Sequence, residues 1–148
     1  MAKKKKIPKY ILDSETSKEV RLSAKIPDSF DRHEPSWKFN LIDNDGPWGW
    51  SNIDTSERWD ILSNKINFKE NLNWAELKEK GSHNIEINKL TKKAQKRLVE
   101  IGCNDIDELF SLRISGKERI WGIRDRFALK IIWWDPEHEV CPSLKKHT

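Results

Sequence analysis

The chain has 148 residues, of which 36% are hydrophobic and 35% are charged, and its formal net charge is +4. This length suits one domain with a modest core and excludes two full-sized domains. The longest apolar run, residues 131–134, is too short to span a membrane, and no apolar stretch follows the basic start as in a secretory signal. We therefore expect a cytoplasmic protein without a membrane partner.

Cys103 and Cys141 are the two cysteines of the chain. Neither has Cys or His neighbours at the spacing of a zinc site, and two cysteines make no disulfide framework. Free thiols, and no metal or other cofactor, are the expectation.

The first 35 residues contain a lysine run and three prolines without sustained periodicity, which predicts a basic, partly disordered arm. Residues 36–148 are expected to form a single α+β domain. Alternation over residues 37–41 predicts a strand that ends at the turn-forming residues 43–47. Trp48 and Trp50 follow, and we expect them to anchor this loop to the core rather than to face a ligand.

Two to three helices are expected next. Asp54 and Glu57 form a capping-box pattern, after which apolar residues recur at spacings of three and four: Trp59, Leu62 and Ile66. A second capping pattern predicts a short helix over residues 73–80. A third helix is expected over residues 91–101, closed by Gly102, with an inward face of Ala94, Leu98 and Ile101. Its outward face carries four cations that suit an RNA backbone: Lys92, Lys93, Lys96 and Arg97.

Residues 109–114, 118–124 and 128–134 read as three strands with short connections, which predicts an antiparallel meander. The expected fold is therefore α+β: an N-terminal strand, helices, then the meander. Strict alternation predicts one face of the last strand with Leu129, Ile131 and Trp133, and the other with Lys130 and Trp134.

Arginines on the expected meander are candidate phosphate ligands, because guanidinium binds phosphate in bidentate fashion. Arg113 and Arg119 lie on adjoining strands across a tight turn and can approach each other. Ion pairs with acids on a solvated face are the alternative. Further candidate RNA contacts are Lys117, Arg124, Lys145 and Lys146, with Trp134 as a base-stacking residue.

His138 follows the last expected strand, where loops often carry functional residues. Its acidic neighbours Glu137 and Glu139 are expected to raise its pKa, which suits a general acid. Two alternatives are a surface ion pair and a metal site that also uses Asp135.

The stretch over residues 109–123, LFSLRISGKERIWGI, resembles the meander of the RelE/ParE superfamily of bacterial toxin–antitoxin toxins. The shared features are a strand ending Leu-Arg, a turn with Gly, and a strand opening with Arg, an apolar residue and an aromatic. The resemblance extends to residues 128–138 and to the order of strand, helices and meander.

This resemblance implies an endoribonuclease that halts translation, on the ribosome or free, with RNA as substrate and an antitoxin protein as partner. Arg119 and Arg113 then match basic positions that stabilise the phosphate, and His138 matches the last acid–base position. Two other hypotheses stay open from the same surface. One is a noncatalytic nucleic-acid-binding module, and the other is a ParE-like toxin that binds a protein target.

Overall fold

The computed structural model describes residues 28–142. Lys145 and Lys146, and most of the expected N-terminal arm, lie outside the described residues. The described strands are β1 (Ser36–Lys38), β2 (His83–Glu86), β3 (Glu108–Arg113), β4 (Arg119–Asp125) and β5 (Ala128–Asp135). The α-helices are α2 (Thr55–Asp60), α3 (Trp74–Glu79) and α4 (Lys92–Glu100). A π-helix spans Ile61–Ile66, and 3-10 helices span Asp28–Arg32, Trp50–Asn52, Asn67–Asn71 and Ile87–Lys89.

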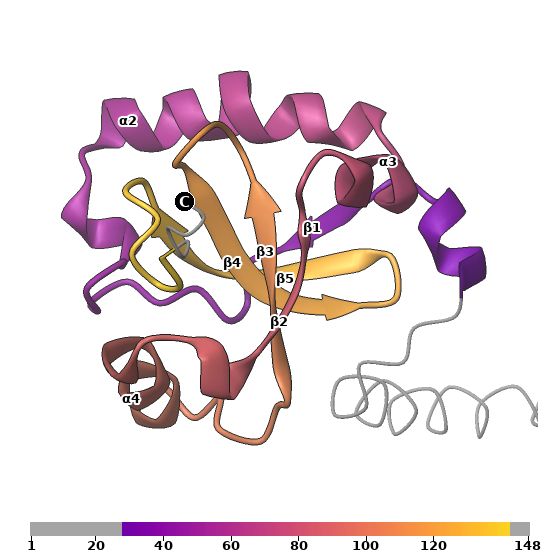
Figure 1. Cartoon of the computed structure of the whole chain (residues 1–148). Helices are drawn as coiled ribbons and strands as arrows, with labels where there is room; N and C mark the ends of the chain where they lie inside the picture. The colour runs from indigo at the N-terminus through magenta and orange to yellow at the C-terminus, as the bar shows by residue number, and fades with distance from the viewer. Residues whose placement is uncertain (1–27, 143–148) are drawn as a thin grey trace, which may run out of the picture.

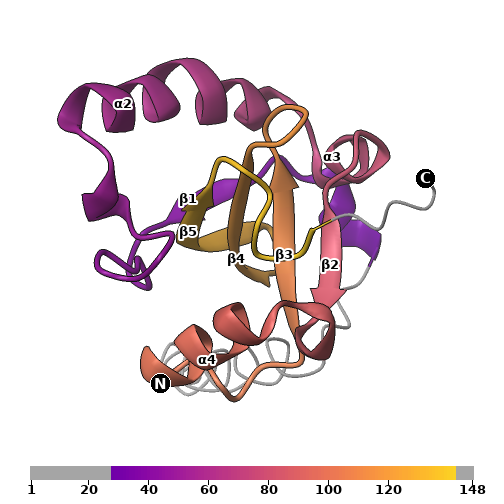
Figure 2. The ribbon, with the colours of Figure 1, turned by 60° about the vertical axis from the view of Figure 1, so that its left-hand side comes forward.

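One mixed sheet, in the order β1-β5-β4-β3-β2, lies at the centre of the domain. Strand β1 runs parallel to β5, and every other neighbouring pair is antiparallel. The helical segment that starts with α2 lies on one side of the sheet and α4 lies on the other (Figures 1 and 2). The α+β class is therefore confirmed. Within residues 28–142, none of the helices has the length and apolarity that crossing a bilayer requires.

All three strands expected near the C-terminus are present within a residue or two of their predicted ends. The expected N-terminal strand is shorter, because β1 ends at Lys38. Strand β2 was not expected, since only Ile85 among its four residues is apolar. Pairing with β3 makes it a strand: His83 lies opposite Ser111, and Ile85 lies opposite Leu109. It forms an edge of the sheet, where a strand needs only one partner.

Local capping predicted the helix starts correctly. At α2 the Asp54 side chain accepts a hydrogen bond from the Glu57 N–H at 2.7 Å. At α3 the capping box is complete, because Asn73 and Glu76 each accept a bond from the backbone N–H of the other. Gly81 follows α3 with φ at +109°, a conformation that glycine adopts without strain.

The predicted apolar face of the first helix is confirmed at Ile66 but wrong at Trp59 and Leu62. Trp59 is 67% exposed and Leu62 is 39% exposed, whereas Ile61 and Ile66 are buried. The reason is that Ile61–Ile66 forms a π-helix, in which hydrogen bonds join residues five apart. Positions with that spacing therefore share a side, and a pattern search at α-helical spacing selects the wrong residues.

The face beneath this helical segment forms one half of the hydrophobic core. Trp74 and Phe110 pack edge to face with ring centroids 5.1 Å apart, and both are fully buried. The other half lies under α4, where Ala94 and Leu98 are buried and Trp48 packs 5.0 Å from Trp133. Both halves bury apolar area that drives folding.

The pairing of β4 with β5 is interrupted by a bulge. Trp121 lies opposite Trp133, whereas the next residue, Gly122, lies opposite Ile131. Ile132 is therefore an extra residue in β5. A Cβ atom at Gly122 would collide with the backbone of Lys130, so glycine permits the close approach of the strands at this point.

The extra residue reverses the expected alternation in the second half of β5. Ile132 and Trp133 both pack on the α4 side of the sheet. The side under α2 receives Leu129, Ile131 and Trp134. The prediction that grouped Trp133 with Leu129 and Ile131, and Trp134 with Lys130, is wrong, because a one-residue insertion exchanges the faces.

The buried carboxylate of Asp43 joins α4 to the sheet. It receives hydrogen bonds from Arg97 Nη2 at 2.7 Å, Arg97 Nε at 2.9 Å and Trp133 Nε1 at 2.7 Å. Burial alone would raise the pKa of Asp43, but these hydrogen bonds outweigh it and hold the pKa below its ordinary value. Arg97 is thus a structural partner of Asp43 and not one of the outward cations of α4, as the sequence suggested.

We predict that Asp43→Asn lowers the free energy of unfolding by about 2–4 kcal/mol, because Arg97 and Trp133 lose the charged acceptor they share. Chemical denaturation of both proteins measures the difference. Since the pKa of Asp43 is lowered by folding, this stabilisation is present above the unfolded pKa of about 3.9 and is lost as the pH falls below it.

The exposed neighbour Asp45 supplies the control. Asp45→Asn is expected to change the free energy of unfolding by less than about 0.5 kcal/mol. Equal effects of the two substitutions at neutral pH would contradict the role assigned to Asp43.

Candidate functional site

Two neighbouring rows of side chains cross the sheet at the end of β3 and the start of β4. In the first row Arg113, Arg119 and Asp135 lie directly opposite one another on β3, β4 and β5. In the second row His83 lies opposite Ser111, which lies opposite Trp121. Residues two apart along a strand share a face, so both rows lie on the same side of the sheet.

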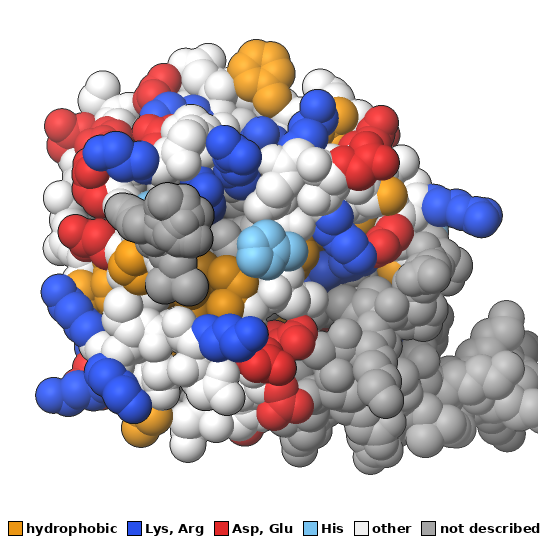
Figure 3. All heavy atoms as spheres, in the orientation of Figure 1, with side chains coloured by type: hydrophobic (Ala, Val, Ile, Leu, Met, Phe, Trp, Pro, Cys, Tyr) orange, Lys and Arg blue, Asp and Glu red, His pale blue; other side chains and the backbone are white. Residues whose placement is uncertain are grey.

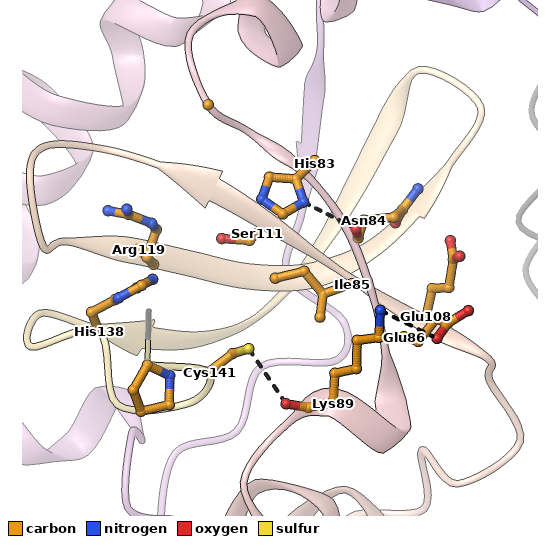
Figure 4. A pocket seen from close by; sticks show the side chains of 12 residues that line it. His83, Asn84, Ile85, Glu86, Lys89, Glu108, Ser111, Arg119, His138 and Cys141 are labelled. Carbon is orange, nitrogen blue, oxygen red and sulfur yellow. Dashed lines mark hydrogen bonds and ion pairs between the residues drawn. The ribbon is translucent and has the colours of Figure 1, made fainter. Parts of the chain in front are cut away.

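A cavity of about 560 Å³ opens over these rows. Arg119, His138 and Ser111 line it, as do Cys141 and all four residues of β2, which begins with His83. Figure 4 shows Arg119 and His138 side by side at one end of the cavity, with Ser111 between them and His83. The predicted residues Arg119 and His138 are therefore brought together, and Arg113 lies next to Arg119 on the adjacent strand.

The buried carboxylate of Asp135 positions the loop that carries His138. Its Oδ2 accepts hydrogen bonds from Trp121 Nε1 and from the Val140 N–H, both at 3.0 Å, and its Oδ1 accepts one from the Glu139 N–H at 2.9 Å. The chain thus turns tightly after β5, and His138 has φ at +61°. Such a conformation is uncommon for a residue with a side chain and is enriched at functional sites.

The pKa of His138 is shifted in the direction opposite to our expectation. Burial is the main cause, and the charge of Arg119 adds to it, so that the pKa lies below the ordinary value. Its acidic neighbours do not reverse this, because Glu137 pairs with Lys117 at 3.0 Å and Glu139 accepts a hydrogen bond from Trp48. A histidine with a lowered pKa is neutral at neutral pH and suits a general base rather than the expected general acid.

The guanidinium of Arg119 is partly held by its own hairpin turn. Its Nη1 donates to the carbonyl oxygens of Ser115, Gly116 and Glu118, at 2.9, 3.2 and 3.0 Å. Its Nε and Nη2 have no acceptor among residues 28–142, which leaves one edge of the guanidinium for a ligand. Burial, together with repulsion from Arg113, lowers the pKa of Arg119.

Sequence reasoning missed His83 and Ser111, which line the cavity and carry groups that can take part in chemistry. His83 lies on an edge strand with no periodic pattern, and its Nδ1 is 3.1 Å from the carbonyl oxygen of Asn84. Ser111 is 2% exposed, and its hydroxyl has no hydrogen-bond partner among the described residues, although it borders the cavity. Serine is common inside strands, so its sequence position alone carries no signal.

Several predicted RNA contacts lie elsewhere or are inaccessible. Trp134 is 2% exposed and cannot stack on a base. Arg124 is buried, with its guanidinium 4.2 Å from the Trp74 ring centroid and 2.7 Å from Asp31. This ion pair also attaches the 3-10 helix Asp28–Arg32 to β4. The helix falls within the expected N-terminal arm. Both predicted roles are wrong, because long-range packing uses these side chains in the interior.

The remaining predicted cations are on the surface. Lys92, Lys93 and Lys96 are exposed on α4, as expected, but none of them lines the cavity. Lys93 lies over the Trp48 ring at 5.6 Å. Lys117 is exposed on the hairpin turn. Figure 3 shows basic side chains across the upper part of the face in view, above a histidine near its centre.

No protein-family model, curated protein or solved structure matches the chain. The resemblance to the RelE/ParE superfamily therefore stays a prediction. Among the described residues, no group of three or more His, Cys, Asp or Glu side chains is placed to hold a metal ion, including Asp135 with its neighbours.

We predict that His138 titrates below the ~6.5 of an ordinary histidine, because its site is desolvated and lies near Arg119. NMR titration of the imidazole signals, assigned with His138→Gln, measures this pKa. Arg119→Gln removes one positive charge and should raise the pKa of His138. Lys92→Gln, on exposed α4, should leave it unchanged, and a wild-type value above 6.5 would contradict the site geometry.

Proposed function

We propose that the protein binds RNA in this cavity and cleaves it by attack of a ribose 2′-hydroxyl on the adjacent phosphodiester. The observation that carries the proposal is the convergence of His83, His138 and Arg119 on one cavity with the unpartnered hydroxyl of Ser111. Two imidazoles can serve as base and acid, and the cation and the hydroxyl can stabilise a phosphate whose charge increases in the transition state.

His138 is the base in this mechanism, because its lowered pKa keeps it neutral at neutral pH. It takes the proton of the 2′-hydroxyl while the bond from O2′ to phosphorus forms. The bond from phosphorus to O5′ breaks, and protonated His83 donates a proton to the departing O5′. The products are a 2′,3′-cyclic phosphate and a 5′-hydroxyl end. The Asn84 carbonyl accepts from His83 Nδ1 and leaves Nε2 for the substrate.

Arg119 supplies the main electrostatic stabilisation. Nη1 is fixed by the turn carbonyls, so Nε and Nη2 are held in place to donate to two phosphate oxygens. Preorganised donors of this kind lower the barrier without reorganisation during the reaction. Ser111 adds a donor from the sheet, and Arg113 adds positive charge beside Arg119.

We further propose a RelE-like arrangement and a toxin role. The successive antiparallel strands β3, β4 and β5, which follow β1 and the helices, support this proposal, whereas β2, between α3 and α4, is an addition to the order that the resemblance implies. The same resemblance suggests messenger RNA as the substrate, on the ribosome or free, and an antitoxin as the natural inhibitor.

We expect the purified protein to cut single-stranded RNA and to leave a 2′,3′-cyclic phosphate, whereas the same strand with 2′-deoxyribose is not cut. His138→Gln and His83→Gln should each reduce the rate by about 10²–10⁴-fold, because each removes a proton-transfer group. Gel analysis of end-labelled strands and mass spectrometry of the products measure both effects.

His33→Gln is the matched control, because His33 packs against Phe30 and Phe127 and does not line the cavity. It should cleave at the wild-type rate. If the wild-type protein binds RNA in a salt-sensitive way but does not cleave it, the catalytic proposal is contradicted and the noncatalytic nucleic-acid-binding module is favoured. Capture of one protein after nuclease treatment would instead favour the ParE-like alternative.

Expression in a bacterial host is predicted to arrest growth through loss of messenger RNA. Arg119→Ala should relieve the arrest at equal protein level, because the transition-state charge loses its principal donor. Growth curves with immunoblots and RNA integrity measure this outcome. Normal growth with the wild-type protein abundant would contradict the toxin role but not the cleavage reaction measured in vitro.

A further inference from the structure

A second group of cations adjoins the cavity on the side of Arg113. Lys69 belongs to the 3-10 helix Asn67–Asn71, Lys80 directly follows α3, and Arg113 ends β3. Arg113 lies across Gly81, a residue of the cavity wall: a Cβ atom there would be 3.0 Å from the Arg113 Cδ and 3.1 Å from its Nη1. Lys80 is the chain neighbour of Gly81, and Lys69 interacts electrostatically with both Lys80 and Arg113.

Within residues 28–142, these three cations lack acidic partners. No carboxylate among the described residues forms an ion pair with Lys69, Lys80 or Arg113. Other lysines on the same elements or nearby are paired, for example Lys78 with Asp31 at 2.8 Å and Lys65 with Glu118 at 2.7 Å. Lys92, Lys93 and Lys96 on α4 also lack ion pairs within the described part of the chain, but they do not line the cavity, whereas Arg113 lies beside its wall residue Gly81.

The charges also repel one another. Burial is the main reason that the pKa of Lys69 is lowered, and the charges of Lys80 and Arg113 add to it. Arg113 in turn lies directly opposite Arg119, and like charges in that position destabilise a sheet. A folded protein gains no stability from such a grouping, whereas an anion bound there relieves both the repulsion and the lack of partners.

We propose that Lys69, Lys80 and Arg113 form a second phosphate subsite, which holds the phosphate next to the scissile one on a single strand of RNA. The inference rests on the proposed function for the identity of the first subsite at Arg119 and His138. Arg113 lies opposite Arg119 in the sheet and beside Gly81 of the cavity wall, so two consecutive phosphates of one strand can be neutralised together. The ligand class is therefore an oligonucleotide with at least two phosphates and not a mononucleotide.

The test uses short 2′-deoxy oligonucleotides with one, two or three phosphates, which bind without being cleaved. Calorimetric titration of the wild-type protein at low salt should show that the second phosphate increases affinity by on the order of tenfold. Lys69→Met and Lys80→Met should each remove most of this increase and leave the affinity for the one-phosphate ligand unchanged. Each should also reduce the slope of log affinity against log salt by about 0.7.

Lys78→Met is the matched control, because Lys78 lies on α3 but is paired with Asp31. It should keep the full gain from the second phosphate. Thermal unfolding checks the folded state: neutralising Lys69 or Lys80 relieves repulsion, so the midpoint should be unchanged or higher.

The subsite is overturned if the second phosphate adds nothing in the wild-type protein, or if Lys78→Met loses as much as Lys69→Met. These results are separable from the cleavage reaction. A gain from the second phosphate without cleavage of RNA supports the subsite and contradicts the catalytic proposal. Cleavage without that gain contradicts the subsite alone.

Discussion

The buried carboxylate of Asp135 is the interaction on which the candidate site depends. A carboxylate without solvent contact must be satisfied by hydrogen bonds. One donor from β4 and two from the loop after β5 satisfy it. The same bonds force the tight turn that gives His138 its left-handed conformation. The position of His138 thus follows from the need of the buried Asp135 carboxylate for hydrogen-bond donors. The free energy of these hydrogen bonds offsets the cost of holding φ of His138 at +61°.

Charge placement separates structural cations from candidate functional ones. Arg97 and Arg124 are bound to the buried or half-buried acids Asp43 and Asp31, where they join helices to the sheet. Arg113, by contrast, has no carboxylate partner among residues 28–142, and Arg119 lies between it and Asp135 in the sheet. Ion pairing therefore distinguishes these arginines, although all four look equivalent in the sequence. An unpaired cation that is partly desolvated costs stability, which is reasonable only where a ligand supplies the missing anion.

The bulge at Ile132 determines which residues of β5 lie on each face of the sheet. Without it, Trp133 would lie on the face under α2, and its indole would not reach Asp43. With it, Trp133 joins the α4 side, on which Asp135 and the cavity rows also lie. The opposite face is covered by the helical segment from α2 to the 3-10 helix Asn67–Asn71, with Ile61 and Ile66 buried against it. The helical segment therefore completes a core on the face opposite the cavity.

The sequence by itself determined those features that depend on neighbouring residues. Capping residues such as Asn73 predicted helix starts, apolar runs with short connections predicted three strands, and the short hairpin placed Arg113 opposite Arg119. Features that depend on long-range pairing were decided only by the tertiary structure. Residues 83–86 form strand β2 because they pair with β3, and this pairing brings His83 beside Ser111. The bulge, the π-helix and the partners of Arg97 and Arg124 likewise follow from packing, because inserting a residue or burying an ion pair leaves no periodic signal in the chain.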